Sequence, residues 1–263
     1  MQPLIPLGGY AGWRFLSASL DSQMARFAQS PVAARDMEYF RQEIGNITSA
    51  EDLVSDFRLL KVSLGAFGLQ DDLPNRAFIR KVLADGVVAD GALANRLADK
   101  RYRAFSETFG FGGPLPPRTG LAGFADRILA RFERQEFERA VGDQNPDLRL
   151  ALGAARELPE IAARGLRDST AWLTVMGNPP LRAVFETAFD LPKSVGTLDL
   201  DQQLKAFRNG AERRFGSSEF AQFSDPDRIN DLIRGFTLRS EASFGPSPLT
   251  RGFAALTLLQ AAL

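Results

Sequence analysis

The stretch LGAFGLQDD (Leu64–Asp72) contains a predicted helix ending that decides how the rest of the chain is interpreted. Glycine readily adopts the left-handed conformation that often follows a helix, and the apolar residue after it contacts a residue of the last turn. If Gly68 is this left-handed residue, Leu69 pairs with Leu64. The phrase therefore predicts a helix stop with a positive φ at Gly68.

Two later stretches, SETFGFGGP (Ser106–Pro114) and ETAFDLPKS (Glu186–Ser194), repeat the phrase. The predicted stop residues are Phe67, Gly68 and Leu69, then Phe109, Gly110 and Phe111, then Phe189, Asp190 and Leu191. The later copies predict the apolar pairs Phe105 with Phe111 and Phe185 with Leu191. Aspartate tolerates the left-handed conformation less well than glycine, so the third ending is the weakest of the three. Their uneven spacing excludes a true solenoid repeat.

The apolar residues follow a helical period along almost the whole chain. Trp13, Leu16, Leu20, Met24 and Phe27, for example, are three or four residues apart, as one buried helix face requires. No sustained alternation with hairpin signals indicates strands. We therefore predict an all-α fold, an irregular multi-helix bundle of about 10–12 helices.

Local signals suggest where several helices begin and end. The spacing of TSAE (Thr48–Glu51) is that of a capping box, which predicts one helix running from there to Phe67. Asn145-Pro146 predicts the start of another helix, in which Pro159 is expected to cause a kink or a split.

The clearest break in the chain is GFGGPLPPRTG (Gly110–Gly120), where helix-breaking residues dominate. One interpretation is an N-terminal helical subdomain over 1–112, a Pro/Gly loop over 113–120 and a C-terminal helical subdomain over 121–263. The other is a long loop within a single domain, and the sequence leaves both open.

Composition excludes several kinds of chemistry. The chain has no histidine and no cysteine, so it lacks a Ser-His-acid triad, imidazole or thiolate metal ligation and a cysteine nucleophile. Its glycines match no phosphate-binding fingerprint. The 32 basic and 32 acidic residues balance, which gives no electrostatic case for nucleic acid. We predict no catalytic residue, no cofactor, no metal and no specific small ligand.

The sequence also bears on location. The N-terminus lacks a charged start and is broken by Pro and Gly, so no secretory signal is predicted. No apolar run reaches the length of a membrane span. We expect a cytoplasmic protein.

Three charged features have an ordinary interpretation beside a functional one. Asp71 and Asp72 are expected to cap the following helix rather than to form an acid pair. KRYRAF (Lys100–Phe105) is expected to be a core stripe flanked by exposed arginines rather than a nucleic-acid site. Only five of the 32 basic residues are lysines, and codon bias is the favoured reason for this excess of arginine over anion recognition.

The C-terminus carries a candidate interaction surface. It consists of Leu249, Phe253, Leu256, Leu259 and Leu263. Their spacing of three and four residues is typical of a coiled-coil seam. The stripe either closes the core of a monomer or docks on another subunit, and both alternatives stay open.

Several long stretches resemble an uncharacterised bacterial family that is classed as a domain of unknown function. They are DMEYFRQEIGNITSAEDLVSDFRLLKVSLGAFGL (36–69), ALANRLADKRYRAFSETFGF (92–111), PLIPLGGYAGWRFL (3–16), NPPLRAVFETAFDLP (178–192) and SDPDRINDLIRGFTLR (224–239). Members occur in alphaproteobacteria, some within or near flagellar gene clusters. The resemblance implies a flagellum-associated role and supplies no catalytic residues.

Two functions are therefore compatible with the sequence. The first is a non-enzymatic helical interaction protein that binds a protein partner or a second copy of itself, as a flagellar accessory or assembly factor. If it is flagellar, export without a cleavable signal is the alternative to the cytoplasm. The second is an enzyme or small-ligand-binding protein that uses carboxylates and arginines in a helical cleft.

Overall fold

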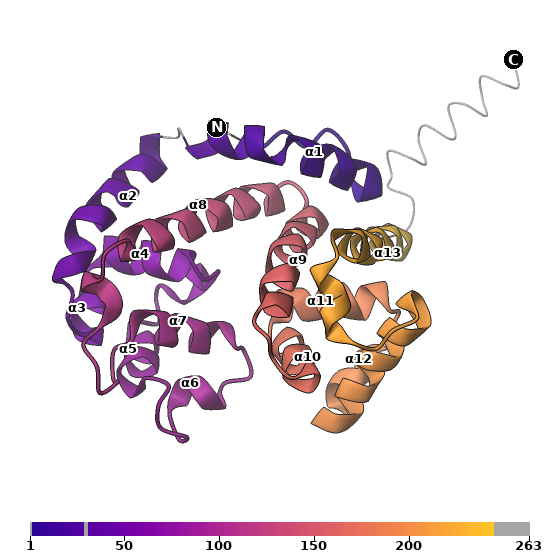
Figure 1. Cartoon of the computed structure of the whole chain (residues 1–263). Coiled ribbons are helices and arrows are strands. Elements are labelled where there is room, and N and C mark those ends of the chain that lie inside the picture. Colours follow the sequence, from indigo (N-terminus) through magenta and orange to yellow (C-terminus); the bar gives the residue numbers. More distant parts are fainter. Residues whose placement is uncertain (1, 29–30, 245–263) are drawn as a thin grey trace, which may run out of the picture. The chain divides into compact units, whose positions relative to one another are not determined.

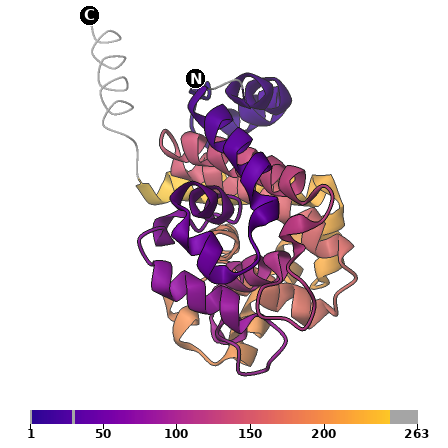
Figure 2. The same ribbon diagram turned by 90° about the vertical axis from the view of Figure 1, so that its left-hand side faces the viewer.

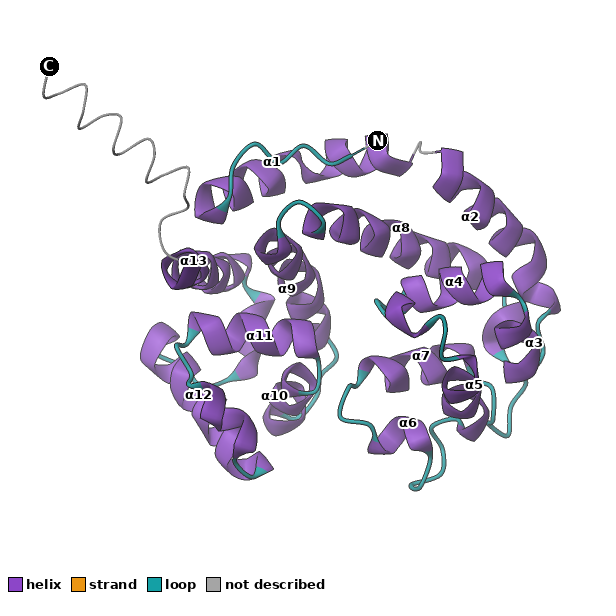
Figure 3. Ribbon diagram, turned by 180° about the vertical axis from the view of Figure 1, so that it is seen from behind, coloured by secondary structure: helices purple, strands orange, loops and turns teal. Residues whose placement is uncertain are grey.

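The computed structural model describes residues 2–28 and 31–244, and within these ranges it contains helices and loops but no strand (Figure 3). Thirteen α-helices are present in this part of the chain, so the predicted all-α class is confirmed. The C-terminal stripe from Leu249 to Leu263 lies outside the described residues.

Proline and capping residues begin many of the helices. The Asn145 side chain accepts from the backbone N–H of Leu148 at 3.0 Å, with Pro146 in the first turn, as predicted. Pro31, Pro179 and Pro226 are likewise the first residues of their helices, because proline fixes φ and has no N–H to leave unpaired there.

Two local predictions were wrong. The capping box uses Ser49 with Asp52 instead of Thr48 with Glu51. The helix that it begins ends at Ser55, because Asp56 is extended and its carboxylate caps a new helix by accepting from the N–H groups of Arg58 and Leu59. Of the kink or split expected at Pro159, the split is excluded, because this proline lies inside one helix that continues to Ala163.

The chain divides into two compact units. The first consists mainly of residues 18–144, with residues 2–4 and 177–179 added to it. The second contains residues 5–17, 145–176 and the described residues from 180 onward. Helix α1 (Gly9–Ala28) contributes to both units, and the main change from one unit to the other falls between Gln144 and Asn145.

In the first unit, α2, α4 and α8 lie side by side, and α3 and α5 pack together next to them (Figure 1). Its helices are coloured indigo to magenta in Figure 2, which shows the unit from the side. They are α2 (Pro31–Glu43), α3 (Ala50–Ser55), α4 (Phe57–Gly65), α5 (Arg76–Asp85), α6 (Leu93–Arg96), α7 (Arg101–Phe109) and α8 (Phe124–Gly142).

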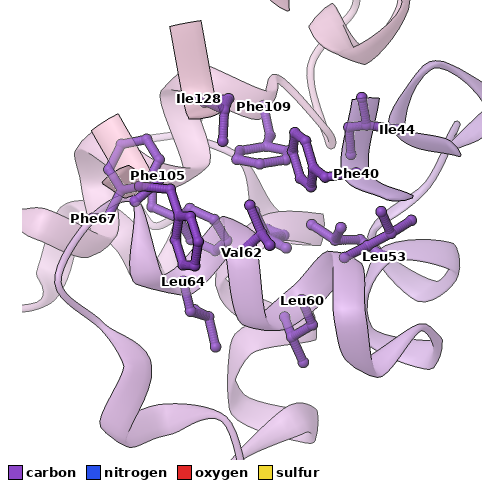
Figure 4. Close-up of a cluster of buried hydrophobic side chains, with 14 of the residues drawn as sticks. Phe40, Ile44, Leu53, Leu60, Val62, Leu64, Phe67, Phe105, Phe109 and Ile128 are labelled. Carbon is purple, nitrogen blue, oxygen red and sulfur yellow. The ribbon is translucent and has the colours of Figure 1, made fainter. Parts of the chain in front are cut away.

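The core of the first unit brings α8 together with the elements before the Pro/Gly loop. Phe40 and Val62 are fully buried in the same cluster as Phe105, Phe109 and Ile128 (Figure 4). The loop over 113–120 therefore lies within this unit and does not separate the two. The difference from the predicted boundary arises because the apolar face of α8 is shared with α2, α4 and α7.

In the second unit, α13 packs along α9, and α10 packs against α12. The helices are α9 (Pro146–Ala163), α10 (Asp168–Met176), α11 (Pro179–Ala188), α12 (Leu200–Phe215) and α13 (Pro226–Phe244). A short 3₁₀ segment, η5 (Phe220–Ser224), contacts α9, α10 and α13.

An aromatic cluster fills the core of the second unit. The Trp172 ring is edge-on to Phe185, Phe207, Phe220 and Phe223, with centroid distances from 5.2 to 6.5 Å. Because aromatic rings carry a negative face and a positive edge, these geometries add to the gain from burial. Trp172 is thus the centre of this core.

Candidate functional site at the arginine-held helix endings

The first copy of the phrase ends α4 with a Schellman motif. Gly68 has φ +67°, the Leu69 N–H donates to the Leu64 carbonyl at 2.9 Å, and the Gly68 N–H donates to the Gly65 carbonyl at 3.1 Å. These two bonds define this type of ending. Leu64 and Leu69 are both buried in the core of the first unit.

The second copy ends α7 in a simpler way. Gly110 has φ +72°, and its N–H donates to the Ser106 carbonyl at 2.9 Å, which is the single bond of the αL ending. Phe109 contacts both aromatic residues of the predicted pair. Its centroid is 5.0 Å from that of Phe105 and 5.9 Å from that of Phe111.

The third copy, which follows α11, places an aspartate in the left-handed conformation. Asp190 has φ +55° and is the one non-glycine residue with positive φ in the described ranges. The Leu191 N–H donates to the Glu186 carbonyl at 2.9 Å, and the Asp190 N–H donates to the Thr187 carbonyl at 3.2 Å. These two bonds form a Schellman motif again. Here the left-handed residue is an aspartate, which disfavours this conformation.

An arginine from elsewhere in the chain lies on each ending. Arg101 Nη1 donates to the Gly68 carbonyl at 2.6 Å, and Arg239 Nη1 donates to the Ala188 carbonyl at 2.9 Å. The Cγ of Arg118 lies 3.3 Å from the position that a Cβ on Gly110 would occupy. The last carbonyls of a helix carry partial negative charge, so a guanidinium beside them is stabilising.

Sequence reasoning missed this use of arginine. It attributed the excess of arginine to codon bias and expected the arginines of KRYRAF to be exposed. Arg101 is instead partly buried, and its guanidinium is also paired with Asp99 through an N–O distance of 2.7 Å. A cation inside the last turn can be read from the sequence, but a cation that folding brings to a helix end from another element cannot.

The residues beside the first ending form a structural tie. The Tyr102 hydroxyl donates to Asp72 through a very short hydrogen bond, and Asn75 rather than either aspartate occupies the N-cap position of α5. Asp71 and Asp72 therefore do not cap the following helix as predicted. Burial and the bond to Asp72 raise the pKa of Tyr102 above its usual value. Tyr102 is therefore neutral near pH 7 and keeps the proton that it donates to Asp72. This hydrogen bond links α7 to the 64–72 segment.

A surface hollow of about 410 Å³ runs along α12 in the second unit. Its lining residues are Asp201, Leu204, Lys205, Arg208, Asn209, Glu212 and Ser218. All but the last lie on one face of α12, because positions 201, 204, 205, 208, 209 and 212 recur at the i, i+3, i+4 spacing of a helix. Their charged groups therefore stand side by side along a helix and do not oppose one another across a cleft.

The part of the chain that the structure describes contains no cluster of three or more Asp or Glu residues that could hold a metal ion. No helix within 2–28 or 31–244 is long and apolar enough to cross a membrane.

Comparisons with known proteins add the following. No curated protein matches the chain. The chain is similar to the crystal structure of protein AGR_C_984 from Agrobacterium tumefaciens, with 27% identity and a TM-score of 0.73 over 91% of this chain and 97% of that one. Residues 66–229, which contain the left-handed residue of each of the three helix endings, match the family described as "Protein of unknown function (DUF1217)". The match spans more than half of the chain, and the protein therefore belongs to the DUF1217 family.

Proposed function

We propose that this protein is a non-enzymatic helical interaction protein. It would bind a protein partner or a second copy of itself through Leu249, Phe253, Leu256, Leu259 and Leu263. The observation that carries the proposal is the apolar stripe itself, which falls in the 19 residues after the end of α13. Five large apolar residues on one face of a helix are the usual anchors of a helix that docks in a groove.

Deletion of residues 249–263 tests this role. We expect the shortened chain to keep its helical circular dichroism and its cooperative unfolding, because the two cores remain. Light scattering should show a smaller assembly than the full chain, or loss of a partner that the full chain binds. Unfolding of the shortened chain would contradict the proposal, since it would place the stripe in the core.

Point variants of the full chain make the same test without a truncation. Leu256→Asp puts a charge in the stripe and should reduce assembly. Thr257→Asp adds the same charge one residue further on, outside the stripe, and should leave assembly unchanged. Equal effects of the two variants would count against a defined apolar face.

We further propose that the interaction serves the flagellum. The support is the resemblance of the chain to family members encoded within or near flagellar gene clusters. A clean deletion strain should lose motility or filament assembly, and the wild-type gene should restore it. Normal motility and normal filaments in the deletion strain would overturn the flagellar part while leaving the interaction role intact.

The compartment follows from the same proposal. We expect the protein in the cytoplasm, and a flagellar role gives export without a cleavable signal as the alternative. Fractionation of cells that carry intact flagella distinguishes the two.

Ligand binding is the second candidate function, and the hollow on α12 is the observation that favours it. Its volume falls within the range of small-ligand sites, and it contains two carboxylates and two cations. A ligand that binds in this hollow through its carboxylates and arginine should bind the Arg208→Ala variant more weakly than the wild type. A ligand that binds this variant as well as the wild type would exclude the hollow as its site.

A further inference from the structure

The main chain of Pro3 and Leu4 is held by the side chains of two glutamines of the first unit. The Leu4 N–H donates to Gln23 Oε1 at 2.7 Å, and Gln23 Nε2 donates back to the Leu4 carbonyl at 3.2 Å. Gln144 Nε2 donates to the Pro3 carbonyl at 2.9 Å. Three successive main-chain groups are therefore bonded, much as when a peptide strand adds to the edge of a sheet.

Gln23 is placed to bind main chain rather than a side chain. It lies in α1 and is 5% exposed, and its Nε2 also donates to Ser19 Oγ at 2.9 Å, which fixes the orientation of the amide. A buried amide needs partners for both its oxygen and its NH₂ group. One residue of an extended chain supplies both, because its N–H and its carbonyl point to the same side.

The site encloses one side chain of the bound segment. Pro3 is buried, whereas Leu4 is 60% exposed. The site therefore fits an extended segment in which a proline is followed by a residue of any kind. A cavity of about 60 Å³ beside the segment is lined by Gln2, Pro3, Leu4, Gln23, Arg26 and Phe27.

The connection from this segment to α1 is exposed. Leu4 lies beside Gln23 in the last two turns of α1, yet the helix begins at Gly9, so residues 5–8 run back along it (Figure 3). Residues 6–8, which include a proline and a glycine, are exposed. An exposed connection of this kind can open, and identical chains can then exchange the segment that it joins.

We propose that Gln23 and Gln144 form a peptide-binding site whose ligand is the 2–4 segment of a second copy of the chain. The segment of each copy occupies the site of the other, as the two-fold symmetry of a dimer allows. Exchange loses none of the hydrogen bonds, because the same Pro3 and Leu4 make them in either arrangement. This site is separate from the C-terminal stripe and does not depend on the proposed function.

Two complementary full-length variants test the exchange. Pro3→Asp places a charge at the buried proline position, so this chain keeps a site without its own segment. Gln23→Ala keeps an intact segment but disables the site. Both chains also carry Leu256→Asp, so that the stripe does not contribute to assembly. We expect each chain alone to be monomeric by sedimentation velocity, and the equimolar mixture to form a heterodimer.

A further substitution in the Pro3→Asp chain identifies the site. Gln23→Ala added to this chain should weaken the heterodimer about tenfold or more, because two hydrogen bonds are lost. Gln42→Ala removes an exposed glutamine that bonds Glu38 in its own helix, and it should leave the heterodimer unchanged. Equal effects of the two glutamine variants would contradict the proposed site.

The segment of the other chain is tested in the same mixture. Leu4→Pro removes the N–H that donates to Gln23 and should weaken pairing, whereas Leu4→Ala changes an exposed side chain and should not. Circular dichroism and cooperative unfolding show that each variant is folded. A mixture of folded chains that stays monomeric would assign the site to the segment of its own chain and overturn the proposal. So would equal pairing by the Leu4→Pro and Leu4→Ala chains.

Discussion

Trp172→Ala should lower the free energy of unfolding by about 3–5 kcal/mol, the largest effect that we expect from a single core truncation. The side chain is fully buried and is surrounded by four aromatic rings. Its removal leaves a cavity that neighbouring rings cannot fill without leaving their own contacts, and the Ser218 carbonyl loses its 3.0 Å bond from the indole N–H. Urea unfolding followed by circular dichroism measures this loss.

Phe57→Ala is the matched control, since it removes an aromatic ring that is 51% exposed. Its effect should stay below about 1 kcal/mol. A loss at Trp172 no larger than the loss at Phe57 would show that the aromatic cluster is not the core of the second unit.

Gly112→Ala should destabilise the protein by about 3 kcal/mol, although it adds a single methyl group. Gly112 has φ +72°, which is unfavourable for alanine, and the added Cβ would stand 2.0 Å from the Ala84 carbonyl oxygen. Because the obstacle is backbone, it cannot rotate away. Thermal unfolding should show a clear decrease in the midpoint.

The neighbouring glycine provides the control for this variant. A Cβ on Gly113 would meet only the Gly110 carbonyl, at an ordinary distance of 3.7 Å. Gly113→Ala should therefore be close to neutral. If the two alanine variants unfold at the same temperature, this result would contradict the close approach of Gly112 to the backbone at Ala84.

Helix boundaries were predictable wherever the signal is local. Asn145-Pro146 begins α9 because the cap and the fixed φ act within one turn. Gly68 and Gly110 end helices for the same reason, since a left-handed residue needs only its own backbone freedom. The break at Asp56 was missed because the aspartate can serve either inside a helix or as the cap of a new one.

The division into units depends on packing between distant residues and was therefore not predictable. The loop over 113–120 has the composition of a linker, yet Phe111 before it and Phe124 after it lie in the same core. Their burial is decided by the faces of α2, α4 and α7, which are formed by other parts of the chain.

The contacts of the arginines at the helix endings also depend on packing between distant residues and could not be predicted from the sequence. Arg101 is 33 residues from the Gly68 carbonyl that it binds, and Arg239 is 51 residues from the Ala188 carbonyl. Nothing near either arginine in sequence indicates its partner. The left-handed residues could be identified from the phrase, whereas the cations that hold them required the folded chain.

The recurring phrase is a structural helix ending with a left-handed residue, and Asp190 is the position that tests this most directly. Comparing the unfolding free energies of the wild type, Asp190→Gly and Asp190→Ala by urea denaturation is the measurement required. With φ at +55°, glycine should raise the unfolding free energy by about 0.5–1 kcal/mol, and alanine should lower it. The opposite order, with alanine more stable than glycine, is the result for an ordinary helical position and would contradict the claim.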